Sequence, residues 1–452
     1  MQLRSGGDVT SRSNLKSRLG LLSLSVLILA AAPYKPPEAG TRIIYRHATL
    51  IDGRNPEAQT DIAVVTDGEK IVAVLADRDL TGAQLSGAQQ VDLSGKYLLP
   101  GFIDTHQHLA TPPNRPVAEL QLERLVYSGV TAIRDMADDL RQVSDLTRAA
   151  RVGEIASPDI HYAALMAGPS FFSDPRTHAV AKGAEPGAVP WMQAIDEKTN
   201  MPLAVAQSKG TYATAIKIYA NLPGERVAAI TAEAHRQGMK VWAHGMVFPA
   251  TPNEVVAAGV DTVSHTCYLA YQAMDKRPDS YQNRFPVDAK LFQSDNPVMT
   301  KLFAEMARRG TILDATLHVY PKPEDAAKMK RPPHCTVDLV GKLTNQALRS
   351  GVTITTGTDG ETPADEPWPA LFDEFELLHD QAGFSPAAVI TAATINGAKA
   401  AGQETSMGTI EPGKLANMVV LAKNPLDDVR NLRSVTLTVK RGKQYSRADY
   451  GQ

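Results

Sequence analysis

Eight short apolar segments, each followed by a helical pattern, occupy most of the chain between residues 98 and 402. The strand-like segments lie at residues 99–104, 130–134, 159–164, 214–219, 240–243, 262–265, 311–317 and 353–357. Helical patterns such as those at residues 117–128, 225–237, 299–309 and 337–349 separate them, and several are followed closely by a glycine, a common helix end. Strands that alternate with helices form parallel sheets, so this pattern predicts an α/β fold of the (β/α)₈ TIM-barrel type.

A doubly wound sheet is the competing fold for such an alternation. Its dinucleotide-binding form carries a Gly-x-Gly-x-x-Gly turn after an early strand. No early strand of this chain is followed by that turn, so the barrel is the favoured interpretation.

Both ends of the chain are rich in strands, unlike its middle. Near the N-terminus, the segment 62–74 contains two β-branched runs around Asp67-Gly68, a dipeptide typical of hairpin turns. Near the C-terminus, the segment 417–439 has the same character. Two separate β domains would explain this, but chain ends commonly lie close together. We therefore expect one small β-sandwich built from residues 41–97 and 407–448, beside a barrel of residues 98–406.

The first 32 residues have the layout of a secretory signal peptide. Four basic residues and one acidic residue precede an uncharged apolar run at residues 19–32, which ends in three alanines. As a helix this run is about 21 Å long, too short for a hydrocarbon core of about 30 Å. An uncleaved anchor or a buried helix is the alternative. We expect residues 1–32 to be a signal peptide and the mature protein to be periplasmic or secreted, without stable membrane insertion.

The charge pattern bears on the partners of the protein. Its net charge is −2 and it has no long basic or acidic run, so nucleic-acid binding has no electrostatic support. We expect a small-molecule substrate and a homo-oligomer. The two cysteines, Cys267 and Cys335, either form a disulfide or stay as buried thiols, because a fold of this size does not need the bond.

Side chains that bind metals gather at the ends of the predicted barrel strands, where TIM barrels place their active sites. They come from five different strands and are His106, His108, Lys217, His244, His265 and Asp359. His106 and His108 are two residues apart on one strand, so both rings point to the same side. Each residue has a separate explanation: a satisfied polar histidine, an ion-paired lysine or an aspartate at a helix N-cap. Their joint occurrence at one end of the barrel predicts a metal site.

Lys217 adds information about the kind of metal site. An ammonium group cannot bind a cation, but burial beside cations lowers the pKa of a lysine. The free amine can take up carbon dioxide and become a carbamate, which is long enough to bridge two metal ions. Imidazole and carboxylate ligands suit Zn²⁺, with cobalt, manganese and iron as alternatives. We therefore predict two zinc ions bridged by a carboxylated Lys217.

With these six residues on these strands in this order, the chain resembles the amidohydrolase superfamily, in its binuclear subset with a carboxylated lysine. Within this superfamily, the sequence is most similar to the imidazolonepropionase-like and prolidase-like branch. Three motifs carry the resemblance: Pro-Gly-Phe-Ile-Asp-Thr-His-Gln-His at residues 100–108, Gly-Val-Thr-Ala-Ile-Arg-Asp at 129–135 and Gly-Thr-Ile-Glu-Pro-Gly-Lys at 408–414. The similarity covers about residues 41–445. Asn417 departs from the pattern, which usually has Asp there, but this position belongs to the outer sandwich.

The resemblance implies three groups of ligands: His106, His108 and Asp359 for the more buried ion, His244 and His265 for the more exposed ion, and Lys217 as the bridge. A hydroxide between the ions would be the nucleophile, because metals lower the pKa of bound water. Asp359 would act as general base and then as general acid. His265 would assist electrostatically as a second catalytic residue.

The residues after His244 bear on the reaction type. Deaminases of this superfamily typically have His-x-x-Glu there, whereas His244 is followed by Gly-Met-Val-Phe, so deamination is disfavoured. The resemblance implies hydrolysis of an amide-type C–N bond in an N-acyl amino acid, a dipeptide, or an aryl amide or urea. As an enzyme class, we expect an amidohydrolase, which acts on carbon–nitrogen bonds other than peptide bonds. The alternatives with the same site are an Xaa-Pro dipeptidase or carboxypeptidase-like peptidase, and an esterase or lactonase.

Residues in the loops are candidates for substrate contacts. Tyr219 lies two residues after Lys217 and faces the same way, so we predict that it hydrogen-bonds the substrate. In the long loop after the third strand, Arg176 or His178 would bind an anionic group. Tyr268, after the sixth strand, is a further candidate for a substrate contact. Loop-stabilising contacts are the alternative for each of them.

Two other classes of protein fit parts of the sequence. A serine hydrolase would need a Gly-x-Ser-x-Gly elbow, and the sequence contains none. A non-catalytic metal-binding or solute-binding protein would keep the fold and lose some ligands, whereas all six are present. A metal-dependent hydrolase is the function that the sequence predicts.

Overall fold

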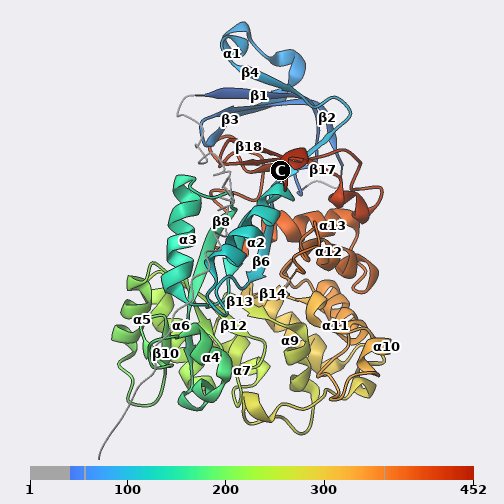
Figure 1. The fold of residues 1–452 in the computed structure, drawn as a ribbon. Coiled ribbons are helices and arrows are strands. Elements are labelled where there is room, and N and C mark those ends of the chain that lie inside the picture. Colours follow the sequence, from blue (N-terminus) through green and yellow to red (C-terminus); the bar gives the residue numbers. More distant parts are fainter. Residues whose placement is uncertain (1–40, 55–56, 361, 452) are drawn as a thin grey trace, which may run out of the picture. The chain divides into compact units, whose positions relative to one another are not determined.

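The computed structural model describes residues 41–54, 57–360 and 362–451 (Figure 1). The predicted signal peptide, residues 1–32, lies outside the described residues. Within these ranges, no helix combines the length and the apolar character that crossing a bilayer requires.

Eight parallel strands form the barrel that the alternating pattern predicts. In chain order they are β6 (Phe102–Gln107), β7 (Val130–Asp135), β8 (Asp159–Ala167), β11 (Ala215–Ile218), β12 (Lys240–His244), β13 (Thr262–Ser264), β14 (Ile312–Asp314) and β15 (Ile354–Thr355). Backbone hydrogen bonds close the ring: the amide of Thr105 donates to the carbonyl of Thr356 (2.8 Å), and the amide of Asp359 donates to that of His106 (2.9 Å). The TIM-barrel prediction is confirmed.

The barrel strands are buried almost throughout. All residues of β6, β7 and β11 are buried, as expected for parallel strands covered on both faces. This burial explains why their sequences are nearly continuous apolar runs, without the alternation of half-exposed strands.

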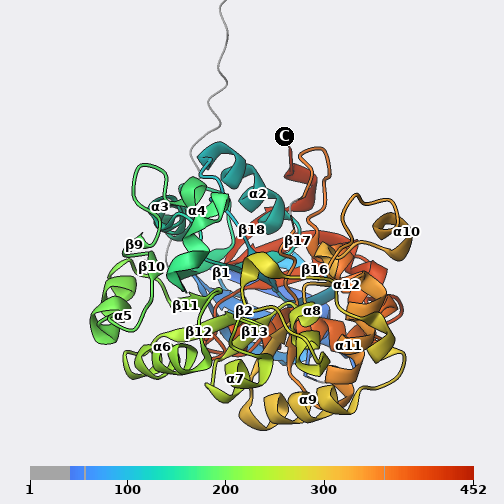
Figure 2. The same cartoon turned by 90° about the horizontal axis from the view of Figure 1, so that it is seen from below.

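Helices follow the strands and surround them, as Figure 2 shows. The longer ones are α2 (Arg115–Tyr127), α3 (Leu140–Val152), α5 (Met201–Gly210), α6 (Gly224–Arg236), α9 (Pro297–Arg309), α11 (Val337–Arg349) and α12 (Leu371–Asp380). In α9 the side chain of Asn296 accepts the amide of Val298 (2.9 Å) and caps the helix start. Apolar residues at helical spacing, such as Leu302 and Met306, are buried, and Gly310 (φ 73°) ends the helix.

Shorter elements lie in the loops and near the C-terminus. The short helices are α1 (Gly82–Leu85), α4 (Pro175–Val180), α7 (Pro252–Ala257), α8 (Thr266–Leu269), α10 (Pro323–Ala326), α13 (Pro386–Thr391) and α14 (Gly397–Ala400). The loop after the third barrel strand also contains β9 (Ala188–Val189) and β10 (Met192–Ala194), which pairs with the end of β8. This loop is therefore ordered over the mouth of the barrel.

The two chain ends together form a second sheet, drawn in blue and red in Figure 1. Its strands are β1 (Arg42–Leu50), β2 (Gln59–Asp67), β3 (Lys70–Ala76), β4 (Gln89–Asp92), β5 (Tyr97–Pro100), β16 (Met418–Leu421), β17 (Val435–Lys440) and β18 (Lys443–Ser446). N-terminal and C-terminal strands meet where β16 pairs antiparallel with β5. A separate apolar cluster that includes Tyr45, Val64, Met418 and Val439 forms its core. The prediction that both ends build one β-rich part is confirmed.

The predicted first barrel strand, residues 99–104, is two strands in the structure. Residues 97–100 form β5 in the sheet of the chain ends, and the barrel begins with β6 at Phe102. Gly101 separates them, and a Cβ at this position would lie 2.2 Å from the side chain of Thr131. The continuous apolar run therefore contains two strands that pair in different sheets. The turn between them requires glycine at position 101.

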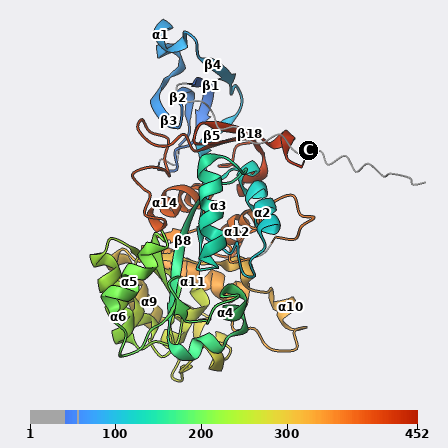
Figure 3. The ribbon, with the colours of Figure 1, turned by 60° about the vertical axis from the view of Figure 1, so that its left-hand side comes forward.

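Buried charges connect this sheet to the barrel. Asp159, at the start of β8, accepts hydrogen bonds from Arg441 (2.8 Å) and lies 2.9 Å from the Lys440 amine. Helix α2 also contacts β17 and β18 (Figure 3). This end of the barrel is opposite the carboxyl ends of its strands, so these ion pairs stabilise the fold at a distance from the site.

Candidate metal centre and substrate cavity

The six predicted ligands converge at the carboxyl ends of the barrel strands. His106 and His108 lie at the end of β6, Lys217 in β11, His244 at the end of β12, His265 just after β13 and Asp359 after β15. The backbone turns sharply at this edge, because His265 (φ 73°) and Asp359 (φ 49°) both adopt the left-handed region. Thr316 after β14 does the same (φ 52°). Such unfavourable conformations in residues other than glycine concentrate at functional sites.

Two histidines and one aspartate form the tightest group. The possible ligand atoms of His106, His108 and Asp359 all lie within 4.8 Å of one another. Asp359 Oδ1 is 3.4 Å from His106 Nε2 and 3.2 Å from His108 Nε2. Burial raises the pKa of Asp359, but the imidazoles around it offset this effect and hold its pKa below the ordinary value. The carboxylate is therefore ionised at neutral pH, as a metal ligand must be.

The far nitrogen of each of these histidines is held by a carboxylate. His106 Nδ1 lies 2.7 Å from Asp314 Oδ2, and His108 Nδ1 lies 2.7 Å from Asp138 Oδ1. Histidines that bind metals commonly donate their other nitrogen to such a partner, which orients the ring. Sequence reasoning did not identify Asp314 and Asp138, although Asp314 is an acid at the end of an otherwise apolar strand.

His244 and His265 form the adjoining pair. Their ring centroids are 4.9 Å apart, and the ring of His265 is also 4.9 Å from that of His106. His265 Nδ1 is bonded to the Thr316 hydroxyl (2.9 Å), and burial lowers the pKa of His265 to about 3. His244 Nδ1 is buried and has no hydrogen-bond partner among the described residues. Neutral imidazoles with an unpaired nitrogen are the form in which histidine binds metals.

Lys217 is enclosed beside these histidines. Its side chain is 1% exposed, and its amine reaches the Ser264 hydroxyl at 3.5 Å. Within the described ranges no carboxylate forms an ion pair with it, and burial lowers the pKa of Lys217 to about 7, although Asp314 and Asp359 act in the opposite direction. Much of this amine is therefore neutral near pH 7, which carbamate formation requires. The donor set of four imidazoles, one carboxylate and one neutral amine fits a pair of divalent cations.

A cavity of about 450 Å³ opens above these residues and exposes His108, His244, His265 and Asp359 to a ligand. This size suits a small molecule. Tyr219 and Tyr268 line the cavity, as does Arg176. His178 is exposed on α4 and is not among the lining residues. The structure therefore brings Tyr219 to the cavity and places His178 outside it.

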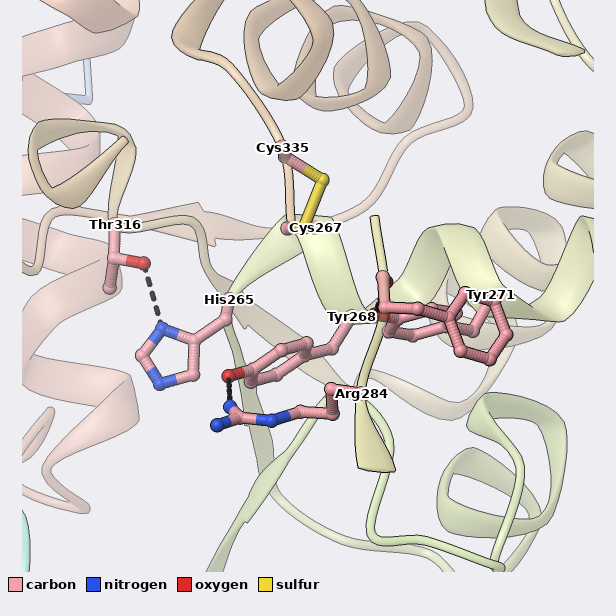
Figure 4. Close-up of a disulfide and its surroundings, with 8 residues drawn as sticks. His265, Cys267, Tyr268, Tyr271, Arg284, Thr316 and Cys335 are labelled. Carbon is pink, nitrogen blue, oxygen red and sulfur yellow. Dashed lines mark hydrogen bonds between the residues drawn. A yellow bond between two sulfur atoms is a disulfide. The ribbon is translucent and has the colours of Figure 1, made fainter. Parts of the chain in front are cut away.

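One wall of the cavity consists of three tyrosines and Arg176, and Arg284 contacts two of these tyrosines without lining the cavity itself. Tyr219 and Tyr281 accept hydrogen bonds from Arg176, at 3.3 and 3.0 Å. Arg284 donates to the Tyr268 hydroxyl (Figure 4). It also stacks on Tyr281, with 3.3 Å between guanidinium carbon and ring centroid. Tyr281 and Arg284 were not among the predicted residues, because they lie in an irregular loop with no periodic pattern.

Cys267 and Cys335 form a disulfide, which decides between the two alternatives that the sequence left open. Cys267 lies at the start of α8, two residues after His265, and Cys335 lies just before α11 (Figure 4). The bond therefore ties the segment that carries a candidate ligand to the neighbouring loop.

Comparison with known proteins agrees with this arrangement. The chain matches the amidohydrolase family over residues 97–445. It belongs to the amidohydrolase family.

Curated relatives match with lower coverage. An N-substituted formamide deformylase from Arthrobacter pascens is 38% identical over 74 residues, which are 16% of this chain and 13% of that protein. The match therefore spans a small part of that relative. A 5-methylthioadenosine/S-adenosylhomocysteine deaminase from Teredinibacter turnerae is 24% identical over 366 residues, which are 75% of this chain and 74% of that protein.

Solved structures share the fold. An Xaa-Pro dipeptidase with bound methionine has a TM-score of 0.69 at 22% identity, covering 90% of this chain and 100% of that one. Molinate hydrolase has a TM-score of 0.70 at 18% identity, covering 92% and 96%. Phenylurea hydrolase B has a TM-score of 0.68 at 19% identity, covering 90% and 97%. At these identities the likeness concerns the fold.

Proposed function

We propose that this protein is a metal-dependent hydrolase that cleaves an amide-type C–N bond of a small molecule. The observation that carries the proposal is the convergence of His106, His108, His244, His265, Asp359 and a buried Lys217 beneath one cavity. These side chains come from β6, β11 and β12 and from the segments after β13 and β15. The pKa values of three of these histidines and of Asp359 are lowered, which favours the unprotonated state that binds metals. The pKa of the fourth histidine, His108, is raised, because Asp138 and Asp359 outweigh the effect of its burial.

The metal ligands divide into two neighbouring groups. His106, His108 and Asp359 would hold one divalent ion, and His244 and His265 a second. Lys217 as a carbamate would lie between them. Bound ions, with zinc as the first candidate, supply a Lewis acid and an ionised water at neutral pH.

The residues of the chain divide the remaining work. Asp359, ionised and facing the cavity, accepts a proton from the attacking water and returns it to the leaving nitrogen. Tyr219 presents its hydroxyl to the cavity and donates a hydrogen bond to the substrate. The ring of Tyr219 lies 4.1 Å from that of His244, so its contact with substrate is close to the reacting group.

The compartment and assembly belong to the same proposal. We propose that the protein is exported after cleavage of residues 1–32 and works as a homo-oligomer. The Cys267–Cys335 disulfide supports export, because disulfides persist in oxidising compartments.

Metal analysis and a substrate panel test the proposed function. Purified protein should contain close to two transition-metal ions per chain, by inductively coupled plasma mass spectrometry. The metal-loaded enzyme should hydrolyse a member of a panel of N-acyl amino acids, Xaa-Pro dipeptides, peptides ending in Lys or Arg, aryl amides and phenylureas. A folded protein with well under one ion per chain, even after zinc loading, would contradict it.

Lys217→Ala tests the bridging role. The variant should lose most of its metal and activity, and short carboxylic acids such as acetate should restore part of both. Lys209→Ala is the matched control, since the Lys209 amine is on the surface and donates to the Gln237 carbonyl. Unchanged turnover in Lys217→Ala would refute the bridging role.

A further inference from the structure

Arg284 is a cation in contact with the tyrosine wall, without a carboxylate partner. Its Nε donates to the carbonyl of Tyr281 (2.6 Å), and its Nη1 donates to the Tyr268 hydroxyl. Among the described residues, no aspartate or glutamate is in ion-pair contact with Arg284, and the groups that most stabilise its charge are tyrosines. Asp174 also interacts with Arg284, from beyond ion-pair distance. A partly buried charge without a counter-ion is unfavourable for stability. Arg284 is not itself among the residues that line the cavity, but Tyr268 and Tyr281, which it contacts, both line it. Its charge therefore favours a negatively charged ligand group bound at these two tyrosines.

The second arginine of this wall is already neutralised. Arg176 forms a two-point ion pair with Asp174, with Nη2 2.8 Å from Oδ2 and Nε 3.0 Å from Oδ1. Its charge is thus compensated, whereas that of Arg284 is not. The wall therefore carries a net positive charge that comes from Arg284.

This charge lies next to the candidate metal ligands. The ring of Tyr268 is 5.3 Å from that of His244 and 5.5 Å from that of His265. The Tyr281 ring is stacked 6.0 Å from His244. An anion bound here is within a few bonds of a carbonyl placed at these histidines. That separation matches a carboxylate on the carbon next to the amide nitrogen.

Part of the cavity lining is apolar. Met136 follows β7, Leu165 lies in β8, Met192 in β10 and Val180 in α4, and all four are buried residues that line the cavity. β7 is four strands from β13 in the ring of eight, the largest possible separation. Met136, after β7, is therefore across the barrel mouth from Tyr268, after β13, and offers an apolar surface for the acyl half of a substrate.

We propose that Arg284, Tyr268 and Tyr281 form a carboxylate-binding subsite, and that the preferred substrates are amides with a carboxylate on the amine half and an apolar acyl half. This inference rests on the proposed function, because it takes the amide to be cleaved beside the histidines. N-acyl amino acids and dipeptides with an apolar first residue fit this class. Neutral aryl amides and phenylureas do not.

A pair of substrates that differ in one charge tests the subsite. N-butanoyl-L-leucine and N-butanoyl-L-leucinamide are compared on the zinc-loaded full chain by butyrate release. The wild-type enzyme should prefer the acid roughly 10- to 100-fold in kcat/KM, as expected for a charge-assisted hydrogen bond. Arg284→Met should remove this preference by lowering kcat/KM for the acid, mainly through KM. Arg284→Lys should restore part of it.

Arg277→Met is the matched control. Arg277 is exposed on the same loop and donates to the Tyr271 carbonyl at 3.0 Å, so its loss should change neither substrate. Equal kcat/KM for acid and amide in the wild type, or an equal loss for both in Arg284→Met, would overturn the subsite.

Binding distinguishes failure of the subsite from failure of the proposed function. Calorimetric titration with the same two compounds needs no turnover. If neither is hydrolysed, tighter binding of the acid by the wild type and equal binding by Arg284→Met support the subsite and count against the hydrolytic function. Equal binding of both by the wild type overturns the subsite. The wild-type comparison also decides the matter if Arg284→Met does not fold.

Discussion

Asp314 Oδ2 lies 2.7 Å from His106 Nδ1, at the floor of the candidate metal centre. The same carboxylate oxygen is 3.3 Å from Arg134 Nη2 and accepts the Ser264 hydroxyl at 3.1 Å. Asp314 is fully buried, and its pKa is lowered by His106 and Arg134 against the opposing effect of burial. One ionised carboxylate thus orients a candidate ligand, neutralises a buried arginine and holds the hydroxyl that contacts Lys217.

Asp314→Asn should weaken metal binding. The amide keeps the shape of the side chain but removes the charge that orients His106, and loss of such a partner typically lowers metal affinity 10- to 100-fold. Titration with a competing chelator measures the affinity. Asp325→Asn, an exposed position, serves as control. Unchanged zinc affinity in Asp314→Asn would show that His106 does not depend on this contact.

Tyr219→Phe and His178→Ala should behave differently. Tyr219 lines the cavity, whereas His178 lies outside the lining residues. Loss of one neutral hydrogen bond should raise KM about 5-fold in Tyr219→Phe, with His178→Ala close to wild type. Steady-state kinetics on the best substrate of the panel measures both. A larger effect of His178→Ala would show that loop residues reach the substrate in a different arrangement.

The ion pairs of Asp159 should make the free energy of unfolding depend on pH. Burial raises its pKa, but Lys440 and Arg441 lower it by more, so its folded pKa lies below the unfolded value of about 3.9. The stabilisation is therefore present above pH 4 and is lost as the pH falls below it. Asp159→Asn should lower the free energy of unfolding by about 3 kcal/mol at pH 7, with a smaller difference below pH 4.

Urea unfolding at pH 7 and pH 3 measures this difference. Asp275→Asn, on the exposed surface, should match the wild type at both values. A deficit in Asp159→Asn that stays constant with pH would mean that packing, and not charge, accounts for the loss.

The Cys267–Cys335 disulfide should contribute to thermal stability. It closes a loop of 68 residues, for which the chain-entropy model gives about 4 kcal/mol. A reducing agent should therefore lower the melting temperature of the wild type. The double variant Cys267→Ala/Cys335→Ala should melt at a lower temperature with no response to reductant. A wild-type melting temperature that is unaffected by full reduction, verified by thiol titration, would contradict this.

The barrel and its six candidate ligands were predictable because their signals are local. A strand followed by a helix is visible in a short window, and the last polar residue of each strand marks the edge where all strands end. His106 and Asp359 could thus be assigned to one site without knowledge of their distance. The bend at Gly101 was missed because both strands around it are apolar.

The partners of the ligands could not be predicted in the same way. Asp314 is 208 residues from His106 in the chain, and they come together because β6 and β14 lie on either side of β15 in the ring. Arg284 and Tyr281 belong to a loop whose path depends on tertiary contacts. The pairing of Cys267 with Cys335 likewise depends on two loops that no periodic pattern relates.

The closure of the barrel has a consequence for its dynamics. β15 is only two residues long, and the first and last strands are joined by backbone bonds at Thr105 and Asp359. His106 and Asp359 lie on opposite sides of this junction, so an ion held by both would link the first and last strands of the barrel. Amide hydrogen exchange of residues 105–107 and 356–359 should then be slow with metal and fast after chelation. The same short segments therefore close the barrel and carry two of the candidate metal ligands.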